Sequence, residues 1–385
     1  MDCKRNITDL PIEILDILFE CCGDMTNKLH LAQAHPYLAQ AFAYHCRNLY
    51  NHISEDEKKS LCYWRLTLPG CGPNIKKIDR VIRENDHDEV ELVNLIALHC
   101  SKLEKIKLTF ETDSVACVKS LICQRQNSLR AINLRLTSES PEINTVMLHE
   151  FPELPLLEEL KIVNIPIENY YHLKKFENLV KLNIGCDYPM FDCEGRIHIA
   201  IDILALCAPL KKLRILTLRD VTIISSEKNN VHMTVLPMEK LSLIRCVIVY
   251  ELPVCFNLKT FIIKEKMSNA VVHRFILSQG SSLESLYHIC DYYPGYNERF
   301  LEVIRVCHNL RSFRPPYYSV SFNLDFVKEC VDILIENEVT PNNPLVLEVD
   351  RYFNYEDVLK WLKFTPCPEI IGLILINETD EDCLN

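Results

Sequence analysis

The N-terminal stretch Asp9–Phe19 (DLPIEILDILF) carries more apolar positions than a surface helix needs. Pro11 stands where a first helical turn tolerates proline, and apolar residues fill most of the following positions. The acidic residues Glu13, Asp16 and Glu20 are spaced by three and then four, which places them on one narrow face of a helix. The rest of this helix therefore needs two neighbours, and one of them can be another chain.

Two further helical segments are predicted between Asn27 and Tyr44, separated by Pro36. Their apolar positions are Leu29, Leu31, Ala34, Tyr37, Leu38, Ala41 and Phe42. The segment Ser54–Ser60 (SEDEKKS) is polar throughout, which predicts a solvated helix surface or a linker.

Beyond this segment, an apolar phrase of the form L-x-x-L-x-L returns with substitutions. Its copies begin at Leu103, Leu129, Leu157, Leu179, Leu213, Met238, Leu258, Leu283, Leu310 and Ile370. Apart from the longer intervals that follow Leu179 and Leu310, the spacing of successive copies falls in the range of leucine-rich repeats. Helix-like segments precede several copies, at residues 90–103, 198–210, 270–283 and 299–310. One strand and helix cannot bury their own leucines, but a row of such units shares a continuous core, so we predict a curved solenoid of strands and helices.

Four segments complete this pattern. Ile75–Arg80 (IKKIDR) is expected to be a degenerate first unit. A strand at Leu345–Val349 and a helix at Tyr355–Phe364, capped by Asn354, are expected to fill the long interval between Leu310 and Ile370. The interval between Leu179 and Leu213 holds an insertion at Cys186–Gly195, which we expect to project as a loop of the kind that often belongs to a binding surface.

The N-terminal residues resemble an F-box over Ile7–His45. The resemblance rests on Leu10-Pro11, Glu13-Ile14-Leu15, Ile17-Leu18, and the later Leu29, Leu31, Ala34 and Leu38. It implies that these helices dock on a Skp-type adaptor and, through it, join a cullin-based ubiquitin ligase. The residues implied to bind the adaptor are Leu10, Pro11, Ile14, Leu15, Leu18, Leu29, Leu31 and Leu38. The alternative is that the same helices only cap the solenoid.

Composition narrows the class of protein. A 385-residue chain with 48% apolar and 25% charged residues is typical of a folded protein, and its apolar runs are too short to span a bilayer. The N-terminus has no apolar core of a secretory signal, so we expect a cytosolic or nuclear protein whose 19 cysteines stay reduced and serve mainly as small core residues. No C-x-x-C and no glycine-rich phosphate loop occurs, and we expect neither a metal nor another cofactor.

The outward strand positions are rich in positive charge. In L-x-x-L-x-L the leucines point into the core, so the alternate positions line the open, concave face. The 27 such positions of the nine phrases from Leu103 to Leu310 hold nine basic residues and one acidic residue, Glu159, where about three and four are expected from the chain's frequencies. The basic residues are Lys105, Lys107, Arg135, Lys161, Lys181, Arg219, Lys240, Lys264 and Arg314.

This face predicts a substrate surface for an acidic or phosphorylated protein. The net charge of −11 argues against general nucleic-acid binding by the chain. The competing interpretation is that exposed strand positions simply favour long solvated side chains. Toward the C-terminal end Ile262, Tyr287 and Ile289 replace charges on the same face.

The sequence shows no catalytic constellation. His45-Cys46 and His99-Cys100 are neighbours, but on a helix neighbouring side chains point about 100° apart, which suits no nucleophile and base. We therefore predict an α/β protein with an F-box-like unit at residues 1–50, a linker or capping segment at 51–74 and a leucine-rich-repeat solenoid at 75–385. Its expected function is a non-catalytic substrate-recognition subunit of an SCF-type ubiquitin ligase. The alternatives are an interaction scaffold unconnected with ubiquitination and, with no site to support it, an enzyme.

Overall fold

The structure is a computed structural model that describes residues 6–83, 85–137, 147–165, 170–186, 200–224, 236–265, 270–290, 295–316, 319–350 and 355–376. The chain divides into two compact units, Met1–Leu179 and Val180–Asn385, which are described separately below. Both are mixed α/β units with parallel strands. In the described part of the chain, no helix has both the length and the apolar character to cross a membrane.

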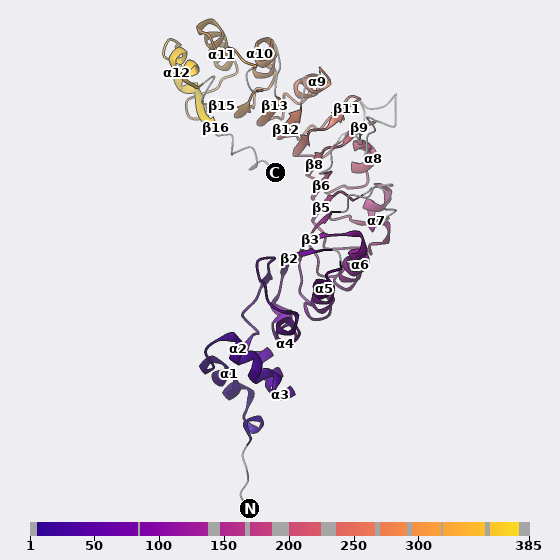
Figure 1. Ribbon diagram of the computed structural model, residues 1–385. Helices are drawn as coiled ribbons and strands as arrows, with labels where there is room; N and C mark the ends of the chain where they lie inside the picture. The colour runs from indigo at the N-terminus through magenta and orange to yellow at the C-terminus, as the bar shows by residue number, and fades with distance from the viewer. Residues whose placement is uncertain are drawn as a thin grey trace, which may run out of the picture. The chain divides into compact units, whose positions relative to one another are not determined.

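The first unit begins with short helices (Figure 1). A 3-10 turn at Ile7–Asp9 is followed by α1 (Ile12–Cys21), α2 (Met25–Gln33) and α3 (Pro36–His45). The Asp24 side chain caps α2 by accepting the backbone N–H of Asn27 at 2.8 Å, and Pro36 occupies the first turn of α3, where its missing N–H costs nothing. Two helices therefore occupy the predicted segment, and Pro36 begins the second of them.

Strands and helices then alternate. The strands are β1 (His52–Ile53), β2 (Lys77–Ile82), β3 (Lys105–Phe110), β4 (Ala131–Leu136) and β5 (Glu159–Val163). The helices between and after them are α4 (Leu61–Cys71), α5 (His87–His99), α6 (Val115–Gln124) and α7 (Met147–Glu150), with 3-10 turns at Gly72–Asn74, Thr112–Ser114 and Tyr170–Lys175. Each strand pairs in parallel with the next, and α5 and α6 lie on one side of β2 and β3 (Figure 1).

The strand register confirms the predicted phrase. Ile106 of β3 lies opposite Ile132 of β4, and Leu108 lies opposite Leu134, so equivalent apolar positions of successive repeats stack and are buried. The expected first unit is confirmed as strand β2, because its Ile78 lies opposite Ile106. At the next inward position of β2, however, a buried Arg80 stands opposite Leu108.

Helix α4 lies within the segment 51–74 and joins the N-terminal helices to the repeats. Its Tyr63 and Trp64 are buried, and so is its Cys71. Gly70 permits close packing on α3, since a Cβ at this position would overlap the backbone of Ala43. The charged segment before α4 ends in Ser60, whose hydroxyl accepts the N–H of Tyr63 and caps the helix.

The second unit repeats the same scheme. Its main sheet has the order β6 (Lys181–Gly185), β8 (Ile215–Arg219), β10 (Lys240–Ile244), β12 (Thr260–Glu265), β13 (Ser285–Cys290), β14 (Ser312–Arg314), β15 (Leu345–Asp350) and β16 (Ile371–Ile376), all in parallel. A smaller sheet contains β7 (Ala200–Asp202), β9 (Thr222–Ile224) and β11 (Val247–Ile248). Its helices are α8 (Ile203–Cys207), α9 (Ala270–Ser278), α10 (Tyr296–Val306), α11 (Leu324–Glu336) and α12 (Tyr355–Leu362), with a 3-10 turn at Pro368–Ile370.

The divergent C-terminal repeat is confirmed as β15 followed by α12, while α11 lies ahead of it where no helix was predicted. The expected helix at residues 198–210 is only partly correct, because Ala200–Asp202 forms strand β7 and the Asp202 carboxylate caps the short helix α8. The proposed cap Asn354 and residues 187–195 of the expected loop lie outside the described residues. The prediction that the cysteines are core residues is correct for most of the described ones, including Cys100, Cys255 and Cys307, but Cys21, Cys62 and Cys123 are exposed.

Charged residues just before the strands alternate in sign from one repeat to the next. The backbones of these residues are hydrogen-bonded in succession, as where the N–H of Arg130 donates to the carbonyl of Glu104 at 2.7 Å. Exposed ion pairs of this kind contribute at most about 1 kcal/mol each to the free energy of unfolding. They also occupy the acidic side chains at the border of the strand face. The ion pairs are Lys76–Glu104 (3.3 Å) and Arg130–Glu158 (2.8 Å) in the first unit, and Arg214–Glu239 (3.4 Å) and Lys259–Glu284 (3.2 Å) in the second.

Candidate protein-interaction surfaces

One side of helix α1 is buried and packs against α3. Leu15 and Phe19 are buried, and the ring of Phe19 packs on Phe42 of α3 with 5.3 Å between centroids. The helix stops at Cys21 because Gly23 adopts a left-handed conformation (φ 72°) that glycine accepts without strain. These contacts fix which side of α1 remains open.

The open side of α1 is apolar. Ile14 and Ile17 are 44% and 55% exposed, Pro11 is exposed, and Leu18 is half-buried. Residues three and four apart share a helix face, so these four side chains form one surface, which we call the α1 apolar face. Ile7, in the turn before the helix, is also 39% exposed. Large apolar side chains grouped in this way mark an interaction site more often than single exposed ones do.

The predicted adaptor residues separate into two groups. Leu10, Pro11, Ile14, Leu18, Leu29 and Leu31 are exposed or half-buried. Leu15 and Leu38 are 1% and 2% exposed and belong to the core, so the structure removes them from any docking surface. Ile17 was absent from the predicted set although it is more exposed than Ile14. Its spacing of three from Ile14 is the sequence signal that could have identified it.

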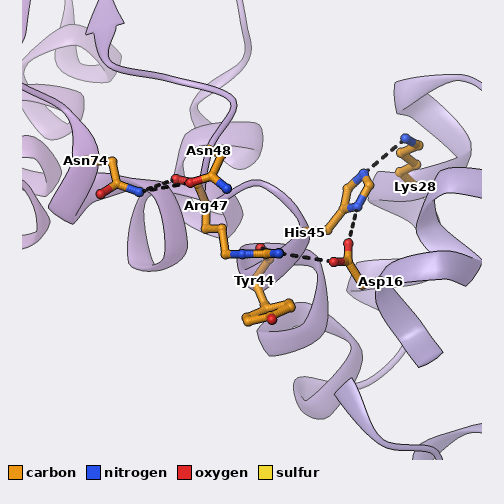
Figure 2. A network of polar contacts seen from close by, with 7 residues as sticks. All are labelled: Asp16, Lys28, Tyr44, His45, Arg47, Asn48 and Asn74. Carbon is orange, nitrogen blue, oxygen red and sulfur yellow. Dashed lines mark hydrogen bonds and ion pairs between the residues drawn. The ribbon is translucent and has the colours of Figure 1, made fainter. Parts of the chain in front are cut away.

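A polar network fastens α1 to the rest of the first unit (Figure 2). The Asp16 carboxylate accepts hydrogen bonds from Nδ1 of His45 at 2.7 Å and from Nη1 of Arg47 at 3.1 Å. Nε2 of His45 lies 3.2 Å from Nζ of Lys28 on α2. Because an ammonium group can only donate, this contact assigns Nε2 as the acceptor and leaves the proton of a neutral imidazole on Nδ1.

The network continues toward the first repeat. The guanidinium of Arg47 lies 3.8 Å from the centre of the Tyr44 ring and donates to the Tyr44 carbonyl at 2.7 Å. Asn74, in the turn before β2, donates from its side chain to the carbonyl of Arg47 at 2.6 Å (Figure 2). Asp16 thus links α1 with α3 and, through Arg47, with the segment that precedes the repeats.

The electrostatics of Asp16 follow from these contacts. Partial burial alone raises the pKa of its carboxyl, but the hydrogen bonds from His45 and Arg47 outweigh burial and hold the pKa below its ordinary value. The sequence pattern placed Asp16 with Glu13 and Glu20 on one polar face. In the structure Glu13 and Glu20 are exposed, whereas Asp16 is turned to α3.

The second candidate surface is the outward face of the strands. In the first unit Lys105, Lys107 and Arg135 are exposed and Lys161 is half-buried. Nζ of Lys107 forms an ion pair with Asp79 on the neighbouring strand at 2.8 Å. Lys77 of β2 lies opposite Lys105 on this face; it is exposed, and the prediction had omitted it because it counted phrases only from Leu103.

In the second unit the outward positions are less open. Lys181 is exposed, and Lys240, Arg219 and Lys264 are half-buried. Arg314 is 2% exposed, which corrects its expected place on an accessible surface. Glu348, on the neighbouring strand β15, has a pKa raised by burial, although Arg314 and a hydrogen bond from Ser312 act against that rise.

The neighbouring apolar positions of this unit are also enclosed. Ile262 and Ile289 are buried, whereas Tyr287 is half-buried. The open positive surface within one unit is therefore that of β2 to β5.

The cysteines beside histidines have the properties of core residues. Burial raises the pKa of the Cys46 and Cys100 thiols to about 12 in each case, so neither holds the thiolate a nucleophile needs at neutral pH. His45 bonds to Asp16 and Lys28 rather than to its neighbour Cys46. Within the described ranges, no three His, Cys, Asp or Glu side chains are grouped as ligands for a metal ion.

Comparison with known proteins leaves the family of this chain open. No protein-family model matches the sequence, and no curated protein matches it. Among solved structures, the chain is similar to one chain of "Crystal structure of Rad7 and Elc1 complex in yeast", with 16% identity and a TM-score of 0.45, over 96% of this chain and 93% of that chain. A likeness at this level does not establish function or partners, which must be argued from the residues themselves.

Proposed function

We propose that this chain is the substrate-recognition subunit of an SCF-type ubiquitin ligase. The helices α1 to α3 dock on a Skp-type adaptor, and the outward face of the strands captures a protein substrate. The observation that carries the proposal is the α1 apolar face: of the residues that resemble the F-box motif, Pro11 and Ile14 are exposed and Leu18 is half-buried, although Leu15 of the same motif is in the core. Burying such side chains against a partner contributes roughly 1.5–3 kcal/mol for each one fully buried.

The mechanism requires no covalent chemistry from this chain. The adaptor links the chain to a cullin, which holds the charged ubiquitin carrier, and the strand face holds the substrate. Holding the two in one assembly raises the effective concentration of substrate lysines near the carrier. The polar network around Asp16 supports this role, because it ties the docking helix to the turn that precedes the repeats. We place the protein in the cytosol or nucleus, where such ligases act.

The test is co-purification of the full chain with a recombinant Skp-type adaptor. Ile14→Asp and Ile17→Asp put a charge on the α1 apolar face, and we expect adaptor recovery to fall more than about tenfold, since an unpaired charge is expensive to bury. Leu98→Asp is the matched control: Leu98 is 65% exposed on α5 of the same unit and outside the proposed contact. Equal recovery of all three variants, each folded by circular dichroism, would show that the docking proposal is wrong.

A second function is an interaction scaffold in which the N-terminal helices only cap the repeats. The close packing of α3 on α4 at Gly70 favours this alternative. It predicts that the full chain recovers no adaptor at all. It also predicts that a chain lacking residues 1–50 has a sharply lower melting temperature.

A further inference from the structure

Two lysines on the strand face of the first unit lie side by side. Lys77 of β2 and Lys105 of β3 are in register on parallel strands, which run about 4.8 Å apart. Both side chains are exposed, and neither forms an ion pair with any residue in the ranges that the structure describes. Lys107 lies two residues along β3 on the same face and is neutralised in part by Asp79.

The surface around this pair is positive. The outward positions of β2 to β5 run in three columns set by the strand register. They carry five basic residues and two acidic ones, in a chain whose net charge is −11. The basic residues are Lys77, Lys105, Lys107, Arg135 and Lys161, and the acidic residues are Asp79 and Glu159.

The acidic residues at the border of this face do not neutralise it. Glu104 is engaged by Lys76 at 3.3 Å, and Glu158 is engaged by Arg130 at 2.8 Å. These pairs balance themselves, so Glu104 and Glu158 do not offset the charge of Lys77 and Lys105. Like charges held this close repel each other, and a negatively charged partner relieves that repulsion.

The excess of lysine over arginine on this face, and the spacing of the lysines, distinguish among possible partners. A phosphate group is best held by the two-pronged guanidinium of arginine, but four of the five basic residues here are lysines, which act as point charges. Lys105 and Lys107 are two residues apart on one strand, about 6.7 Å along it. An extended peptide with carboxylates at alternate positions has the same spacing. The negative charge of the whole chain disfavours a long nucleic acid, which would meet repulsion beyond this patch.

We propose that the outward face of β2 to β5 binds an extended protein segment rich in Asp and Glu, with Lys77 and Lys105 as the central contacts. The segment would belong to the captured substrate, and only in that sense does the inference rest on the proposed function. Binding of the segment itself requires no adaptor, so the two proposals fail independently.

The experiment uses the full chain and a fluorescein-labelled 12-residue peptide of alternating Glu and Ser, followed by fluorescence anisotropy. We expect binding that weakens as NaCl rises from 50 to 300 mM. The double variant Lys77→Glu/Lys105→Glu should weaken binding by about tenfold or more, since it replaces two attractions by two repulsions. The control Lys328→Glu/Lys363→Glu changes the net charge equally at exposed lysines on and just after helices of the second unit, and should change binding less than about twofold.

Several outcomes would overturn the proposal. No binding of the Glu-Ser peptide at 50 mM NaCl would do so, as would an equal loss in the control variant. Tighter binding of a 12-residue single-stranded DNA through the same two lysines would assign the face to nucleic acid instead. Tighter binding of a peptide in which phosphoserine replaces Ser and Gln replaces Glu would assign the face to phosphate.

One outcome would support the proposal and separate it from the docking of α1 to α3. In that outcome Lys77→Glu/Lys105→Glu loses peptide binding but recovers the adaptor at the wild-type level.

Discussion

The ion pair between Arg80 and Glu89 occupies the place of a leucine in the first repeat. Strand register puts Arg80 of β2 opposite Leu108, at a position that points into the core. Its guanidinium is buried, donates from Nε to Oε2 of Glu89 at 3.0 Å, makes a second contact with Oε1, and donates from Nη1 to the Ser54 carbonyl at 2.9 Å. Glu89 lies in the first turn of α5, so the pair joins the strand to its helix.

This arrangement predicts unequal costs for removing the two partners. Removing one side of a buried pair typically costs about 3–5 kcal/mol, because a charge is left without a partner. The side chain of Glu89 is 19% exposed, so water reaches the pair and we expect the lower end, about 3 kcal/mol, for Glu89→Ala. Arg80→Leu restores the apolar residue of the repeat and leaves a carboxylate with access to water. We expect its stability to lie within about 1 kcal/mol of the wild type.

Urea unfolding followed by tryptophan fluorescence measures these costs in the first unit. The chain has two tryptophans, and Trp361→Phe leaves the buried Trp64 of α4 as the only reporter. Asp88→Ala is the matched control, since Asp88 is an exposed acid in the same helical turn and loses only the favourable helix-dipole contribution of about 0.3–1 kcal/mol. The reasoning is refuted if Glu89→Ala costs no more than this control, or if Arg80→Leu costs as much as Glu89→Ala.

Two further predictions concern the N-terminal helices. Gly70→Ala should destabilise the first unit by about 3 kcal/mol, because the added Cβ overlaps the backbone of Ala43 and α3 must move away from α4. Trypsin should then cut the chain within residues 46–60 faster than in the wild type. An unchanged digestion pattern would contradict the close packing. The contacts that lower the pKa of Asp16 below its unfolded value stabilise the fold above about pH 4, and this contribution is lost as the pH falls through the lowered pKa. The melting temperature of the wild type should therefore fall more steeply between pH 5 and 3 than that of Asp16→Asn, and equal slopes would count against the network.

Apolar spacing was sufficient to predict the strands that carry the repeated phrase. In Leu103–Leu108 the inward positions follow directly from the phrase, because side chains of a strand alternate and a shift of one residue would expose every leucine. The same argument located β2 and β15, whose phrases are degenerate. It did not predict α6 or β7, since short segments between phrases carry no long period from which to choose a helix or a strand.

The candidate surfaces were less predictable because exposure depends on neighbours. The motif named Leu15 and Ile14 together, yet Leu15 is buried and Ile14 is open. Both are apolar residues of one helix, and only the position of α3 distinguishes them. The exposure of Arg314 also depends on its neighbours. The phrase predicted that its side chain points outward, but the surrounding residues of the fold bury it.

By itself, the sequence of this protein determined the repeat, the direction in which each strand faces its core, and the helical nature of the N-terminal residues, because these depend on local periodicity. Tertiary structure alone decided that Asp16 meets His45, 29 residues away, that Arg80 finds Glu89 in place of a leucine's apolar contacts, and that Ile17 is left open to solvent. Such pairings depend on how separate elements pack. Local spacing specifies the faces of an element, whereas the free energy of packing against distant elements selects which face is covered.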